Sequence, residues 1–121
     1  MAEGWTKEQR RELRDLQGLA WERELSSALG ELREDFQSWG DGKISSLELN
    51  DRIHRFHNGR SRELFNTYTG RLEAFWLAHL IARGIIEESE VSDSLLAELR
   101  ADIEMYRDRL HLAEESAGTD E

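Results

Sequence analysis

The stretch LSSALGELREDFQSW, residues 25–39, decides the fold of this chain. Its large apolar residues recur in alternating steps of four and three. That spacing places them along one face of an α-helix and is typical of the buried seam between packed helices. We therefore expect these side chains to lie in a helical core. They are Leu25, Leu29, Leu32, Phe36 and Trp39.

Upstream of this seam the apolar pattern changes phase near Gly18. Thr6 and Gln9 have the spacing of a capping box, which marks the start of a helix. We expect one long helix over 7–38 with a jog near Gly18, or two helices that share an axis. A straight helix of that length would span roughly 45–50 Å, which favours an end that projects or pairs with another chain.

Downstream of the seam three further helices are predicted. A short one over 46–58 would end at Gly59, and the next, over 61–82, is apolar almost all round its second half. After a link at 85–92, the last helix covers 93–115. The sequence therefore predicts an all-α, antiparallel helical bundle of about four helices, with a long first helix and a short second helix. Besides the seam, its expected core comprises Leu13, Leu16, Leu19, Leu49, Ile53, Phe56, Leu64, Phe65, Tyr68, Leu72, Phe75, Trp76, Leu80, Ile81, Leu96, Leu99, Ile103, Tyr106, Leu110 and Ala113.

Length and composition favour one globular domain. At 121 residues the chain is long enough to bury a core without disulfides, and it contains neither cysteine nor proline. We expect a single domain over 1–121, with 1–5 and 116–121 frayed. Its longest apolar run, AFWLAHLIA at 74–82, is too short to span a membrane, and the start has no apolar signal region. These features favour a cytoplasmic protein that has no membrane segment.

The charge of the chain argues against polyanionic partners. It carries 26 acidic and 16 basic residues, a formal net charge of −10. A negative mean field repels nucleic acid and acidic membranes, so neither is expected as a partner.

The stretch GDGKISSLEL resembles the second half of an EF-hand calcium loop. With Gly42 at the turn position of the loop, Asp41 and Glu48 fall on two of its ligand positions. The same alignment places Trp39 on a ligand position and leaves too few oxygens for a cation that takes six to eight. Ser45 with Glu48 is also a capping box. The sequence therefore predicts a capped helix start here and no calcium site.

The one basic stretch is DRIHRFHNGRSREL, residues 51–64. If Gly59 ends one helix and Ser61 begins the next, the free amides of the new helix could converge with nearby arginines on a carboxylate or phosphate. Alternatively, these charges only complement a helix end and pair with neighbouring acids. The candidate anion- or partner-binding residues are His54, Arg55, His57, Arg60, Ser61 and Arg62.

The same stretch offers weaker metal and acid–base sites. Asp51, His54 and His57 recur every third residue, and with Glu63 they form a possible metal-ligand set for a hydrolase or metal-binding bundle. Acid–base catalysis by His57 with Glu63, or by His79, is a further alternative. No serine elbow, phosphate loop or dinucleotide motif accompanies these residues. The sequence therefore favours a non-enzymatic protein that needs no cofactor.

Together these patterns predict a small acidic helical interaction module. We expect a homodimer that binds an anionic or acidic partner near the helix junction at 54–63. The alternatives are a metal-binding bundle or metal-dependent hydrolase centred on His54, His57 and Glu63, and a purely structural, coiled-coil-like dimer without a discrete ligand.

Overall fold

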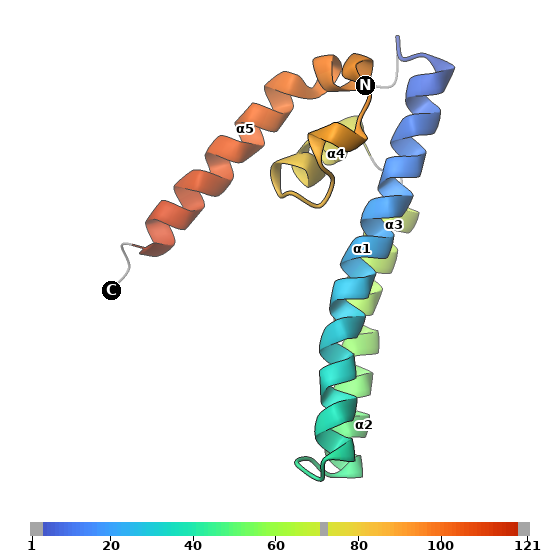
Figure 1. Ribbon diagram of the computed structural model, residues 1–121, viewed down its shortest axis with the longest axis vertical. Helices are drawn as coiled ribbons and strands as arrows, with labels where there is room; N and C mark the ends of the chain where they lie inside the picture. Colours follow the sequence, from blue (N-terminus) through green and yellow to red (C-terminus); the bar gives the residue numbers. More distant parts are fainter. Residues whose placement is uncertain (1–3, 71–72, 119–121) are drawn as a thin grey trace. The chain divides into compact units, whose positions relative to one another are not determined.

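A computed structural model describes residues 4–70 and 73–118, and within them every regular element is a helix (Figure 1). The prediction of an all-α helical bundle is confirmed. The chain divides into two compact units, which are described separately: a hairpin unit, Trp21–Arg71, and a terminal unit, Met1–Ala20 with Leu72–Glu121. The expectation of a single domain stays a prediction.

Helix α1, Lys7–Gly40, is a single helix of 34 residues that contributes to both units. At 1.5 Å per residue it is about 50 Å long. The expected capping box starts it: Gln9 N donates to Thr6 Oγ1 at 3.0 Å and Thr6 N to Gln9 Oε1 at 2.9 Å. The helix passes through Gly18 without interruption, so the alternative of two coaxial helices is wrong.

In the hairpin unit, a tight turn reverses the chain after α1. Gly42 has φ +76°, a left-handed conformation that favours glycine. Ser45 then caps α2, Ser46–Phe56, by accepting from Glu48 N at 3.1 Å, which confirms the predicted helix start. Trp39 Nε1 donates to Ser46 Oγ at 3.0 Å, so its indole links the end of α1 to the start of α2 across the turn.

The predicted stop at Gly59 is wrong. A π-helical turn, η1 (His57–Ser61), joins α2 directly to α3 (Arg62–Thr69), and this second arm of the hairpin runs antiparallel to α1 (Figure 1). The carbonyl of Gly59 accepts from Arg62 N instead of ending a helix. Glycine costs a helix only about 1 kcal/mol, and residues on both sides of Gly59 contact α1: Arg52 pairs with Asp35, and Tyr68 with Glu24.

The single helix predicted over 61–82 is also wrong. Helix α3 ends at Thr69, Gly70 is extended with ψ −179°, and α4, Ala74–Ala82, starts after Glu73. Thr69 Oγ1 donates to Phe65 O at 2.5 Å in the last turn of α3. A glycine beside a β-branched residue is a weak point for a helix, and here the chain leaves the hairpin unit.

In the terminal unit, α4 packs against α5, Asp93–Gly118. Gly84, with φ +79°, turns the chain after α4, and a short 3₁₀ turn, η2 (Glu88–Glu90), lies within the predicted link. Fraying was expected at 1–5 and 116–121. Helix α5 instead continues through residues 116–118, and residues 1–3 and 119–121 lie outside the described residues. The largest fully buried side chains belong to this unit: Leu77, Leu80, Ile86, Leu95, Leu99 and Ile103.

The predicted seam of α1 is only half covered, which corrects the expected core. Leu29, Phe36 and Trp39 are 44–45% exposed, and Phe65 and Phe75 are exposed as well. A hairpin of two helices covers one flank of each seam and leaves the other flank open. The buried residues described in the hairpin unit are Glu24, Ala28, Leu49 and Leu64.

No helix in the described part of the chain combines the length and the apolar character needed to cross a lipid bilayer.

Candidate functional site

A cavity of about 370 Å³ opens on the second arm of the hairpin unit, where η1 meets α3. Because the helix is continuous here, His57, Ser61 and Phe65 follow one another at intervals of four along one face. Arg62 and Asn66 lie one position further on and complete the lining. We call this group of five residues the His57 cavity.

Two arginines of the basic stretch are neutralised by acids of the hairpin. Arg52 binds Asp35 at 2.7 Å and Glu48 at 3.0 Å, and these hydrogen bonds raise its pKa. Arg55 pairs with Asp51 and lies 3.5 Å from Glu48. The predicted candidate Arg55 is therefore part of a surface ion-pair network, as the structural alternative for this stretch expected.

Arg60 also has acidic neighbours. Its guanidinium lies 3.7 Å from Glu24 of α1 and 3.7 Å from Glu63. Glu24 is 6% exposed and accepts a hydrogen bond of 2.6 Å from Tyr68. Arg60 thus compensates a buried carboxylate, which ties the π-helical turn to α1.

Arg62 is the cation of the basic stretch that keeps its charge available. Across residues 4–70 and 73–118 its side chain makes no ion pair or hydrogen bond, and it is exposed. Ser61, its neighbour in the cavity, lies inside a continuous helix, so the free amides expected at a helix start are absent. Hydrogen-bond donors for an anion at this place therefore have to come from side chains and not from free backbone amides.

The residues proposed as metal ligands are not brought together. Within the described ranges, no group of three or more histidine, aspartate or glutamate side chains is placed to hold a metal ion. Asp51 is paired with Arg55, and Glu63 with Arg60. His54, which was a candidate for both the metal and the anion site, is exposed on α2 and does not line the cavity.

His79, the other proposed acid–base residue, lies in α4 of the terminal unit. Its ring is 4.6 Å from that of Trp76 and 5.0 Å from that of Tyr106, measured between centroids. These contacts give His79 a packing role between α4 and α5.

Sequence reasoning found three residues of the cavity and missed two. His57, Ser61 and Arg62 were named; Phe65 was assigned to the core, and Asn66 was not singled out. The break assumed at Gly59 hid the relation between His57 and Phe65. A continuous helix through Gly59 would have placed them on the same face.

No protein-family model matches this chain, and no curated protein or solved structure is significantly similar to it. What the chain does therefore has to follow from the chemistry of its own residues.

Proposed function

We propose that this chain is a helical interaction module that binds an acidic segment of a partner protein at the His57 cavity. The observation that carries the proposal is that the charge of Arg62 is left unpaired by the described residues. Its charge has no intramolecular partner among the described residues, whereas Arg52, Arg55 and Arg60 all do.

The other lining residues define the partner's chemistry. Ser61 and Asn66 supply neutral hydrogen-bonding groups, and His57 supplies an imidazole. Phe65 is 57% exposed and offers an aromatic surface beside the charge. A carboxylate held by Arg62, with an apolar residue against Phe65, fits this combination.

A protein segment fits better than a nucleic acid. The charge of the whole chain is −10, and Arg62 is the one arginine or lysine among the cavity's five lining residues, whereas polyanion binding needs several phosphate contacts. A peptide with one or two acidic residues beside a leucine or phenylalanine presents both features at once.

The proposal is tested with fluorescein-labelled peptides in which Glu or Asp adjoins Leu or Phe, measured by fluorescence anisotropy at low salt. Arg62→Gln should weaken binding about tenfold or more, since a charge-assisted hydrogen bond is lost. Arg55→Gln is the matched control: it removes an arginine of the same arm that is already paired. Replacing Glu by Gln in the peptide should have the same effect as Arg62→Gln.

The proposal fails if no acidic peptide of the panel binds the parent chain, or if Arg62→Gln and Arg55→Gln bind equally well. Retained helicity by circular dichroism establishes that both variants are folded.

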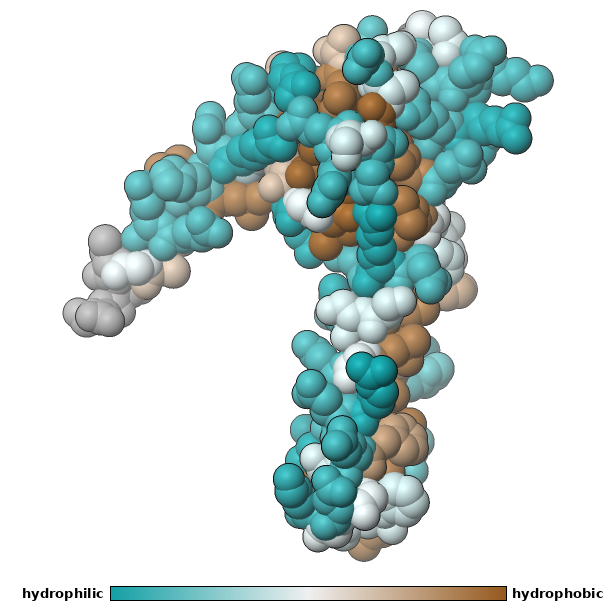
Figure 2. Space-filling view, viewed as in Figure 1, coloured by the Kyte–Doolittle hydropathy of each residue, from teal (hydrophilic) through white to brown (hydrophobic). Residues whose placement is uncertain are grey.

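A second feature favours self-association of the hairpin unit. Along α1, Leu29, Phe36 and Trp39 stay half exposed at the spacing of a helix–helix seam. Apolar residues reach the surface along the limb formed by α1 with α2 and α3 (Figure 2). We propose that a second copy of the chain covers this open flank, so that two hairpins complete a four-helix arrangement.

Charge supports a second copy as the occupant. The hairpin unit, Trp21–Arg71, contains nine acidic and eight basic residues, so its net charge is small and two copies meet there with little net repulsion. The terminal unit carries the acidic excess of the chain.

Sedimentation equilibrium decides this second proposal. The parent chain should be a dimer, and the double variant Leu29→Glu with Phe36→Glu a monomer. Leu47→Glu is the control, because Leu47 is an apolar residue that is 84% exposed and lies off the seam. A monomeric parent at high concentration overturns self-association and leaves the peptide test unaffected.

A further inference from the structure

The terminal unit contains a second, larger cavity, of about 550 Å³. It lies where Trp5, which precedes α1, meets α4 and α5. Two contacts tie the first two turns of α1 to the start of α5: Gln9 Nε2 donates to Ser94 Oγ at 2.7 Å, and Ser92 Oγ donates to Glu12 at 2.6 Å. The cavity is therefore framed by segments that the fold holds together.

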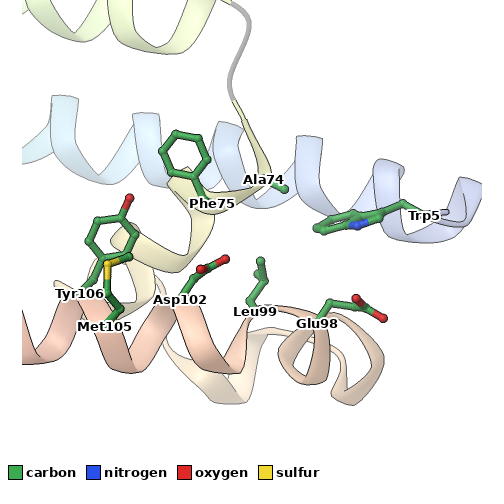
Figure 3. A pocket seen from close by; sticks show the side chains of 8 residues that line it. All are labelled: Trp5, Ala74, Phe75, Glu98, Leu99, Asp102, Met105 and Tyr106. Carbon is green, nitrogen blue, oxygen red and sulfur yellow. The ribbon is translucent and has the colours of Figure 1, made fainter. Parts of the chain in front are cut away.

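Three aromatic side chains reach this cavity from three different segments. Trp5 precedes α1, Phe75 is on α4 and Tyr106 is on α5 (Figure 3). Arg10 donates to the carbonyl oxygen of Trp5 at 3.0 Å, which holds the backbone of the indole residue. Tyr106 packs edge-on against His79, with 5.0 Å between ring centroids.

Two carboxylates complete the lining. Glu98 and Asp102 are one helical turn apart on α5, and the Asp102 carboxylate points into the space between Trp5 and Tyr106 (Figure 3). Among residues 4–70 and 73–118, neither carboxylate has an ion-pair or hydrogen-bond partner. Residues 73–118 contain 11 acidic and four basic residues, so the surroundings add to the negative potential.

Aromatic faces and carboxylates share one preferred ligand, an organic cation. The negative face of an aromatic ring attracts an ammonium or guanidinium group, and a carboxylate attracts the same group by charge. A bare metal ion fits poorly, because calcium takes six to eight oxygens and the described residues hold no group of three metal-ligating side chains.

We propose that the cavity lined by Trp5, Phe75, Glu98, Asp102 and Tyr106 binds an organic cation, an alkylammonium or guanidinium group. The group is either a free amine or a basic side chain of a protein. The site is separate from the His57 cavity, which belongs to the hairpin unit and for which we propose an acidic partner.

The test is a ¹⁵N NMR titration of the full chain with tetramethylammonium chloride, and separately with a peptide that contains trimethyl-lysine. Binding should shift the indole N–H of Trp5 and the amides around Asp102. Asp102→Asn should weaken binding about tenfold, since one of two charges is lost. Asp108→Asn, an exposed acidic residue further along α5, is the matched control and should bind as the parent does.

The two probes separate the two sources of the cation. Binding of tetramethylammonium alone assigns the cavity to a free amine, and binding of both probes assigns it to a basic side chain as well. The proposal is overturned if neither probe shifts the Trp5 indole, or if Asp102→Asn and Asp108→Asn bind equally. Trp5→Leu gives a second check: it should lose the cation without loss of helicity, because Trp5 lies outside α1.

Discussion

Tyr68 donates a hydrogen bond of 2.6 Å to the carboxylate of Glu24 across the hairpin unit. The two residues are 44 positions apart, and Glu24 is 6% exposed. Trp21 stacks on the Tyr68 ring at 5.9 Å between centroids, which holds the phenol in place. A buried charge is tolerated only when polar groups compensate it, so this contact and Arg60 together explain how Glu24 is accommodated.

Tyr68→Phe should therefore lower the free energy of unfolding by about 1.5–3 kcal/mol, the range for a hydrogen bond to a charged group. Urea denaturation followed by circular dichroism measures it. The double variant Tyr68→Phe with Glu24→Gln should recover part of the loss, because the neutral amide costs less to bury. Equal stability of Tyr68→Phe and the parent would contradict this account.

Substitution by alanine should change the stability of the fold in opposite directions at two glycines. Gly42 has φ +76°, where a Cβ is strained, so Gly42→Ala should destabilise the chain by about 1–2 kcal/mol. Gly18 lies inside α1 with no atom within 4 Å of a Cβ built on it, so Gly18→Ala should stabilise by about 0.5–1 kcal/mol. Thermal unfolding of both variants tests the difference, and shifts of the same sign would contradict it.

The ion pairs of Glu88 predict a pH dependence. Hydrogen bonds from Arg107 at 2.8 Å and from Arg100 at 2.9 Å lower the pKa of Glu88 below its usual 4.5. A carboxyl whose pKa is lower in the folded state stabilises the fold above its unfolded pKa, and this contribution disappears as pH falls through the folded pKa.

Glu88→Gln should accordingly melt below the parent at neutral pH, with the gap closing well below pH 4.5. Melting temperatures across that range provide the measurement. A gap that does not change with pH would mean that the glutamine variant acts through packing and not through charge.

The core of the terminal unit should be sensitive to truncation. Leu95 is fully buried, so Leu95→Ala should lower the free energy of unfolding by about 2–5 kcal/mol. Leu112, on the same helix, is 60% exposed, and the free energy of unfolding of Leu112→Ala should lie within about 0.5 kcal/mol of the parent value. Chemical denaturation compares the two, and similar losses would contradict the assigned core.

Local sequence rules predicted the helix starts well. Thr6 with Gln9 forms the expected capping box, and Ser45 caps α2 by accepting from Glu48 N, while the Glu48 carboxylate binds Arg52. These starts were predictable because a cap depends on residues three positions apart. The same rules failed at Gly59 and over 61–82. Whether a glycine ends a helix or is carried within it depends on what the neighbouring residues contact, and here Arg60 contacts a carboxylate of another helix.

By itself, the sequence determined that the chain is helical, where most helices begin and where its basic stretch lies, since these follow from spacing and composition. Only the tertiary structure decided which arginine of the basic stretch 51–64 stays available, that Glu24 is buried, and that Leu29 and Phe36 remain half exposed. The physical reason is that periodicity defines the face of a helix but not what covers it. Coverage and charge pairing depend on contacts between residues far apart in the chain.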